Sequence, residues 1–166
     1  MSEVTVSQTI HSPLQATWAT FAEDFGGIYK YNPRVKHSPL TSSITSGLGA
    51  TRRCEFHDNS TLNEKIVGWE KEKELRVQLI DAAMPLKDIE ATIRFQAIDD
   101  RSSKVAFTMS YTPKFGPLGW VMDRVMIRMM MRKIIKEMLD GLDRHLATGE
   151  IINLPGKQSG PVTGAV

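Results

Sequence analysis

Two charged residues fall where the sequence pattern places apolar side chains. In residues 50–57 the more apolar strand face includes Arg52, and in residues 62–68 the apolar face includes Glu64. A charge in an apolar interior is costly unless an opposite charge pairs with it. We therefore predict that Arg52 and Glu64 form an ion pair, directly or through a water molecule. Such a pair could anchor the polar end of a ligand, or it could serve only to orient the sheet.

The sequence contains no recognisable catalytic motif. It has no nucleophile-elbow serine, no phosphate-binding glycine loop, no dinucleotide fingerprint and no zinc-protease helix. The single cysteine, Cys54, excludes an intramolecular disulfide and a cysteine-based zinc site. The four histidines lie far apart in the sequence, at His11, His37, His57 and His145. The sequence thus predicts no metal and no cofactor, and it assigns no catalytic residue.

The elements that must position these residues belong to an α+β domain. The pattern predicts a first strand over 4–10, a helix over 13–24 and a long helix over 118–148. Six further strands, joined mostly by short turns, are expected over 35–45, 50–57, 62–70, 74–83, 86–98 and 103–112. Short turns favour an antiparallel sheet, and a sheet with one apolar face needs an element packed across it. We expect one domain over 1–152 and a disordered tail over 153–166, which is rich in Gly, Pro and small polar residues.

The long helix carries apolar residues on two faces. Its second half has one regular apolar stripe, whereas the apolar residues of its first half centre on a nearly opposite face. Either the helix is interrupted near 126–130, or its first half is apolar on two sides. Of the nine methionines, six lie in this helix, at Met122, Met126, Met129, Met130, Met131 and Met138. Because methionine adapts its shape, residues 118–138 are predicted to form an adaptable cavity wall, with a plain methionine-filled core as the alternative.

The charge balance gives little indication of a charged partner. With 21 basic and 19 acidic residues the net charge is +2, which does not indicate a nucleic-acid binder. Arg124, Arg128 and Arg132 give the long helix a basic face that could contact an anionic membrane, although a solvated face is the favoured interpretation. The N-terminus lacks the pattern of a secretory signal, and no apolar run has the length of a membrane span. Together with the free thiol, these features predict a cytoplasmic location.

The order of elements, with several short motifs, resembles the START/Bet v 1-like (SRPBCC) superfamily and, within it, the polyketide cyclase/dehydrase and lipid-transport-like family. The resemblance spans about 4–148 and is carried by IHSP at 10–13, Trp18, DFGGIYKYNP at 24–33, GATR at 49–52, Glu64, MPL at 84–86 and YTP at 111–113. It implies a helix-grip fold. In that fold, a curved antiparallel sheet of about seven strands wraps around a long C-terminal helix, and one or two short helices follow the first strand.

The resemblance also implies a function, which is the binding of a small hydrophobic or amphipathic ligand in an internal cavity. The ligand would be a lipid, a polyketide-like molecule or an aromatic compound. The alternatives are an enzyme of the polyketide cyclase, aromatase or dehydratase type, and a quinone-chaperone-like or protein-interaction module. The sequence indicates neither the ligand nor the oligomeric state. Strand parity, helix position and the resemblance together predict the ligand-binding residues Tyr29, Tyr31, Arg52, Phe56, Glu64, Ile93, Phe95, Phe107, Met109, Tyr111, Met122, Met126 and Met130.

Overall fold

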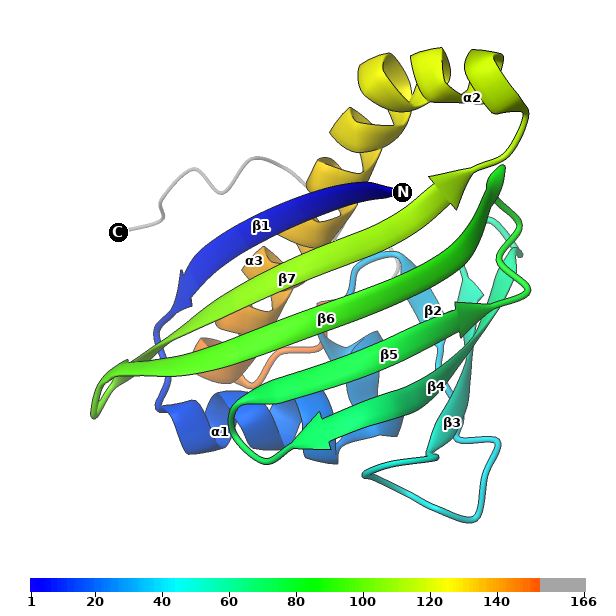
Figure 1. The fold of residues 1–166 in the computed structure, drawn as a ribbon. Helices are drawn as coiled ribbons and strands as arrows, with labels where there is room; N and C mark the ends of the chain where they lie inside the picture. Colours follow the sequence, from blue (N-terminus) through cyan, green and yellow to red (C-terminus); the bar gives the residue numbers. More distant parts are fainter. Residues whose placement is uncertain (153–166) are drawn as a thin grey trace.

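A computed structural model describes residues 1–152 of the chain, and these form an antiparallel sheet with helices on one side (Figure 1). The strands are β1 (Ser2–Ile10), β2 (Val35–His37), β3 (Thr51–Phe56), β4 (Thr61–Glu70), β5 (Glu74–Ile80), β6 (Leu86–Asp99) and β7 (Ser102–Pro113). The helical segments are α1 (Leu14–Trp18), η1 (Ala19–Glu23), η2 (Phe25–Lys30), α2 (Gly116–Met122), η3 (Asp123–Ile127) and α3 (Arg128–Thr148). The predicted tail over 153–166 lies outside the described residues.

The seven strands are arranged in the order β1-β7-β6-β5-β4-β3-β2. Strands β2 to β7 follow one another in space as they do in the sequence, because most of the turns between them are short. The exception is β1, which lies beside β7 along its whole length, from Ser2 opposite Tyr111 to Ile10 opposite Ser103. Irregular pairing in β4–β5 and in β6–β7 accompanies the bend of the sheet. The predicted α+β helix-grip architecture is confirmed.

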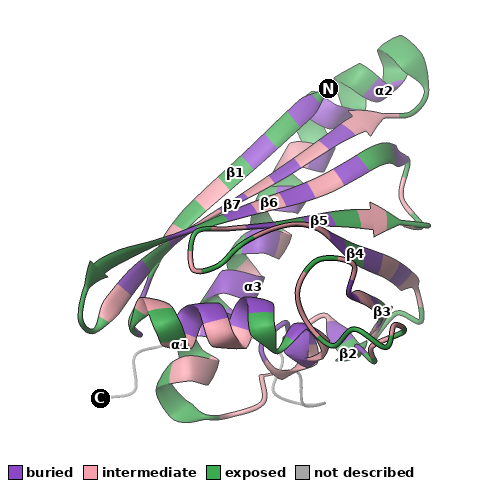
Figure 2. Cartoon of the chain, turned by 60° about the horizontal axis from the view of Figure 1, so that its bottom comes forward, coloured by how far each residue is buried: buried purple, intermediate pink, exposed green. Residues whose placement is uncertain are grey.

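The sheet buries one face, and the core lies between that face and the helices. Alternate residues of β6 and β7 are buried, as strand geometry requires when only one face is covered (Figure 2). Helix α3 lies across this face, while α1 and η1 close the end of the sheet and bring Trp18 into the core. The Trp18 ring meets those of Trp69 and Phe95 edge-on, at centroid distances of 4.9 and 5.1 Å.

One strand is shorter than the sequence predicts. We expected a strand over 35–45, but β2 ends at His37, and the chain then follows β3 as a loop. Pro39 has no N–H to donate to a ladder, although its carbonyl oxygen accepts a hydrogen bond from Arg53 N at 3.0 Å. Beyond it, a single bridge joins Leu40 to Arg52. The proline therefore ends the regular strand while leaving the loop attached to the sheet.

The long helix runs without a break from Gly116 to Thr148, which settles the alternative left open near 126–130. Its hydrogen bonding changes at η3, a single π-helical turn inserted between α2 and α3. A π turn closes i→i+5 instead of i→i+4 hydrogen bonds, so it shifts every later side chain around the helix axis. Leu118, Val125 and Met126 stay exposed despite this shift, so the first half of the helix carries an apolar face that the sheet does not cover. The helix ends at Gly149, whose φ of 71° is the left-handed conformation that favours glycine.

Candidate functional site

A large open cavity of about 1370 Å³ lies between the sheet and α3. The sheet contributes Leu62, Phe107 and Met109, and α3 contributes Met131, Ile134 and Met138. Its deep wall is apolar because inward-facing strand residues meet the apolar stripe of α3 there. Polar and charged side chains also line it, at Arg34, His57, Asp58, Lys133 and Glu137. The arrangement offers an apolar compartment bordered by polar groups.

The ion pair between Arg52 and Glu64 is the main polar feature of this wall. The two residues lie directly opposite each other on β3 and β4, and both are buried. The Nε of Arg52 donates a hydrogen bond to Oε2 of Glu64 at 2.5 Å, and its Nη1 donates to the carbonyl oxygen of Phe25 at 2.6 Å. The guanidinium also lies over the Phe25 ring, 4.0 Å from its centroid. The predicted pairing of Arg52 with Glu64 is confirmed.

Glu64 is the member of the pair that reaches the cavity. Its Oε2 accepts hydrogen bonds from Arg52 and, at 3.2 Å, from the thiol of Cys54. No donor among residues 1–152 occupies Oε1. Burial and the nearby Glu64 carboxylate raise the pKa of the Cys54 thiol, so this thiol stays protonated and is a poor nucleophile. The site therefore offers a hydrogen-bond acceptor, held in place by Arg52, at the wall of an apolar space.

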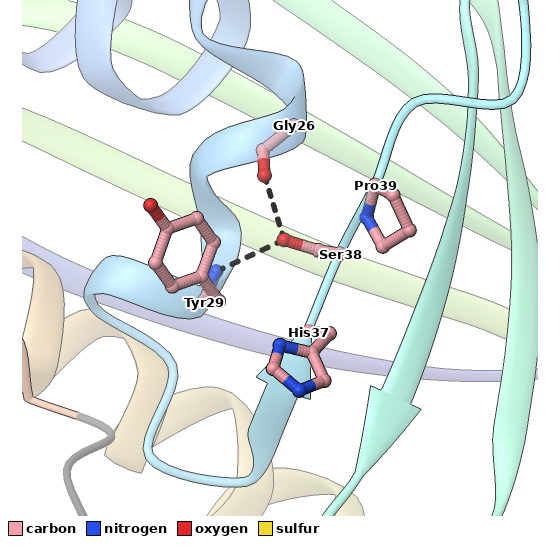
Figure 3. A pocket seen from close by; sticks show the side chains of 5 residues that line it. All are labelled: Gly26, Tyr29, His37, Ser38 and Pro39. Carbon is pink, nitrogen blue, oxygen red and sulfur yellow. Dashed lines mark hydrogen bonds between the residues drawn. The ribbon is translucent and has the colours of Figure 1, made fainter.

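Two of the predicted ligand-binding residues, Tyr29 and Tyr31, do not line this cavity. Tyr31 is buried, stacks on Phe21 at a centroid distance of 5.8 Å, and its hydroxyl has no hydrogen-bond partner within the described chain. Burial raises its pKa. Tyr29 lines a separate surface pocket of about 330 Å³ with His37 and Ser38 (Figure 3). There the Ser38 hydroxyl donates to the Gly26 carbonyl oxygen at 2.7 Å and accepts from the backbone N–H of Tyr29 at 3.3 Å.

The remaining predicted site residues divide into three groups. Phe56, Glu64, Phe107, Met109 and Met130 line the cavity together. Ile93, Phe95 and Tyr111 are buried but do not line it, since Ile93 and Phe95 belong to the packed core and Tyr111 bonds to Asp123. Arg52 is buried and does not line the cavity, but it donates a hydrogen bond to Glu64, which does.

Met122 and Met126 lie at the protein surface, outside the cavity lining. Each comes one residue before a buried residue of the same helix, Asp123 or Ile127, and lies on the exposed side of the helix. Of the segment 118–138, the part that lines the cavity begins at Met130, and the methionine-bearing part before it faces outward.

Asp123 is a buried group that sequence reasoning did not single out. At the start of η3, its carboxylate accepts hydrogen bonds from Ser2 Oγ and Tyr111 Oη, each at 2.5 Å, and lies 3.5 Å from Arg128 Nε. Burial acts to raise the pKa of Asp123, but these hydrogen bonds and the Arg128 charge outweigh it, so the pKa lies below its usual range. A clue was present in the sequence, because Asp123 is the one acidic residue between 116 and 136.

Replacing Asp123 with asparagine is expected to lower the free energy of unfolding by about 1–3 kcal/mol at pH 7, because the amide nitrogen cannot accept a hydrogen bond. A lowered folded-state pKa stabilises the protein fully above about pH 4, and this stabilisation is lost as the pH falls through the folded-state pKa. The difference in the free energy of unfolding between wild type and Asp123→Asn should therefore become smaller in acid. Urea unfolding at pH 7 and in acid measures it, with Asp140→Asn, at an exposed carboxylate, as the control. Equal stability of the two variants at pH 7 would contradict this role.

Residues 1–152 contain no group of three or more His, Cys, Asp or Glu side chains placed to hold a metal ion. None of the helices in this range has both the length and the apolar character needed to cross a bilayer.

Comparison with known proteins identifies the fold. XoxI from Bacillus cereus shares it with a TM-score of 0.73 and 17% sequence identity, over 89% of this chain and 97% of that one. A protein from Thermobifida fusca shares it with a TM-score of 0.70 and 19% identity, over 89% of this chain and 94% of that one. Norcoclaurine synthase from Thalictrum flavum, in complex with dopamine and hydroxybenzaldehyde, shares it with a TM-score of 0.66 and 13% identity, over 88% of this chain and 86% of that one. At these identities the likeness concerns the fold alone. None of the curated protein sequences matches this chain significantly.

The family comparison covers nearly the whole described chain. The family model described as polyketide cyclase / dehydrase and lipid transport matches residues 1–147, from the start of β1 to the last turn of α3. The match includes both strands of the Arg52–Glu64 pair and the α3 face that closes the cavity. This chain therefore belongs to the polyketide cyclase/dehydrase and lipid-transport family.

Proposed function

We propose that this protein reversibly binds a small, largely apolar ligand with one polar end in the cavity between the sheet and α3. The observation that carries the proposal is the cavity itself, about 1370 Å³ in volume, with the buried carboxylate of Glu64 in its wall. Ligand sites in proteins commonly measure about 300–1000 Å³, so this one has room for a lipid-sized or polycyclic molecule.

Glu64 defines the polar end of the proposed ligand. Because Oε1 has no donor among the described residues while Arg52 and Cys54 hold Oε2, the free oxygen can accept a hydrogen bond from a ligand hydroxyl or amine. The adjacent Arg52 guanidinium offsets the desolvation cost of a negative charge at this position in an apolar wall. Phe56, Phe107, Met109 and Met130 would contact the apolar body of the ligand.

The comparisons support a ligand in the lipid, polyketide-like or aromatic range. The family description names polyketide cyclisation, dehydration and lipid transport. The structure of norcoclaurine synthase, which has the same fold, holds dopamine and hydroxybenzaldehyde. Dopamine is an aromatic molecule with hydroxyl and amine donors, the combination that an apolar cavity with a carboxylate acceptor would suit.

Binding is favoured over catalysis by the composition of the deep wall. Acid–base catalysis generally requires at least two polar groups converging on one spot. Among the described residues that line the cavity, Glu64 is the one buried carboxylate, and the adjacent Cys54 thiol has a raised pKa. Tyr31 and Tyr111, which could have supplied a second proton donor, do not line the space. A protein-interaction module would instead be expected to have a filled interior.

Native mass spectrometry of the purified protein, followed by solvent extraction, tests the proposal. We expect a co-purified apolar compound, or saturable binding of an apolar fluorescent dye to the empty protein. Met109→Trp should weaken dye binding by about tenfold, because overfilling one part of the wall costs about 1–3 kcal/mol. Thr108→Trp, at the adjacent residue on the opposite face of β7, is the matched control. Absence of both a co-purified compound and dye binding would refute the proposal, as would equal dye affinity in the two variants.

A further inference from the structure

The first half of the long helix exposes an apolar surface that no part of residues 1–152 covers. We call it the α2 patch, and define it as Phe115, Leu118, Trp120, Val125, Met126 and Met129. Each of these side chains is more than half exposed. Figure 1 shows α2 projecting past the end of the sheet, and Figure 2 colours most of its residues as exposed. Soluble monomers rarely expose so many large apolar side chains together unless the surface has a partner.

The charges around the α2 patch have one sign. Lys114, Arg124 and Arg132 are exposed, and none of them forms a salt bridge within the described chain. The guanidinium of Arg124 lies over the Trp120 ring, 4.5 Å from its centroid, so positive charge and aromatic surface coincide. The nearest carboxylate along the helix, Asp123, is buried and engaged by Ser2, Tyr111 and Arg128. No exposed negative charge therefore offsets the patch along α2 and η3.

We propose that the α2 patch docks on an anionic lipid surface. A helix with aromatic and large aliphatic side chains beside arginine and lysine lies in the plane of such a surface, with its apolar side chains among the acyl chains and its cations at the headgroups. Tryptophan is preferred at that depth because its ring is apolar while its N–H can still donate a hydrogen bond. A protein partner would satisfy the apolar side chains equally well, but the unopposed positive charge favours the lipid surface.

The α2 patch lies next to the cavity, so docking through it would orient the cavity relative to the bilayer. Met130 follows the patch by one residue, is partly exposed, and also lines the cavity. Docking through the α2 patch would therefore bring one end of the cavity wall close to the bilayer. The docking does not depend on what the cavity holds, and it is tested separately from ligand binding.

Vesicle co-sedimentation tests the docking, using phosphatidylcholine vesicles with and without phosphatidylglycerol at low and at high salt. We expect the wild type to sediment with the anionic vesicles at low salt and to be released at high salt, because salt screens the attraction. Arg124→Gln with Arg132→Gln should weaken binding about 25-fold, since each cation near an anionic surface contributes about fivefold. Trp120→Ser with Met126→Ser should weaken it by about tenfold or more.

Matched controls place the same changes elsewhere on the surface. Leu48→Ser removes a side chain as exposed as that of Met126, at 65% for each, and Arg53→Gln and Arg101→Gln remove exposed charges far from α2. These variants should bind vesicles as the wild type does. Failure of the wild type to bind anionic vesicles at low salt overturns the proposal, as does unchanged binding by the patch variants. A dimer in light scattering that Trp120→Ser with Met126→Ser converts to a monomer, without vesicle binding, would identify a protein interface instead.

Discussion

Removing either partner of the Arg52–Glu64 pair is expected to lower the free energy of unfolding by about 3–5 kcal/mol, because the remaining charge is left buried without its counter-ion. Replacing both partners together, as in Arg52→Met with Glu64→Leu, should cost much less than the sum of the two single changes. Chemical denaturation of the wild type, both single variants and the double variant gives the coupling energy, which we expect to be about 2 kcal/mol or more.

The sheet provides a matched control for this measurement. Glu74 and Arg94 also lie directly opposite each other on neighbouring strands, with Arg94 Nε 2.9 Å from Glu74 Oε2, but this pair is exposed. Exposed pairs contribute about 0.2–1 kcal/mol, so the same set of changes there should give a small coupling energy. If the buried pair coupled no more strongly than the exposed pair, water in the cavity would have to solvate Glu64 fully, and the proposed anchoring role would fail.

Gly141→Ala is expected to destabilise the protein by about 2–4 kcal/mol, although alanine favours a helix over glycine by about 1 kcal/mol. The reason is a close approach between α3 and the end of η2. A methyl group on Gly141 would overlap the backbone carbonyl oxygen of Tyr31, and a backbone atom cannot turn away as a flexible side chain can. To avoid this overlap, α3 would have to move away from the end of η2. The chain after α3 is attached to the same segment, because the Ile152 N–H donates a hydrogen bond to the Lys30 carbonyl oxygen.

Thermal and urea unfolding measure this effect, with Lys133→Ala at an exposed position of the same helix as the control. Lys133→Ala should change stability by less than about 0.5 kcal/mol. An increase in stability for Gly141→Ala would mean that α3 is not held against Tyr31. It would also remove the explanation for a glycine in the middle of this helix.

Strand residues could be placed from the sequence because strand geometry is periodic. Alternation along β3 and β4 was enough to put Arg52 and Glu64 on the core side, and the cost of a buried charge was enough to pair them. The same alternation brought Phe107 and Met109 to the cavity wall. Alternation does not distinguish cavity-lining positions from packed positions on the same strand face. The sequence therefore predicts Ile93 and Phe95 as ligand-binding residues, whereas both lie in the packed core near Trp18.

Helical and irregular segments were less predictable for two physical reasons. Tyr29 lies in the short 3₁₀ helix η2 and Tyr31 directly follows it, so no repeating pattern indicates which ring turns inward. For the long helix, the apolar pattern gives two nearly opposite faces and does not indicate which of them lies against the sheet. Met122 and Met126 face outward, while Met131 and Met138 face the cavity.

Asp123 shows how tertiary contacts escape sequence reasoning. Its partners Ser2 and Tyr111 come from β1 and β7, which meet only because the first strand joins the sheet beside the last. Local pattern treats Asp123 as one acidic residue on a helix. Its burial and lowered pKa depend on a strand at the other end of the domain.

The pairing of β1 with β7 also sets an order of events during synthesis and folding. Hairpins from β3 to β7 can form one after another as the chain lengthens, because each strand pairs with its neighbour in sequence. β1 has no partner until β7 has emerged, and α3 follows later still. Long-range pairing of this kind slows folding, because the chain must close a large loop before any contact compensates the lost entropy. A ribosome-bound chain that stops before β7 therefore carries β1 as an unpaired strand open to aggregation, which makes the early nascent chain the form most in need of a chaperone.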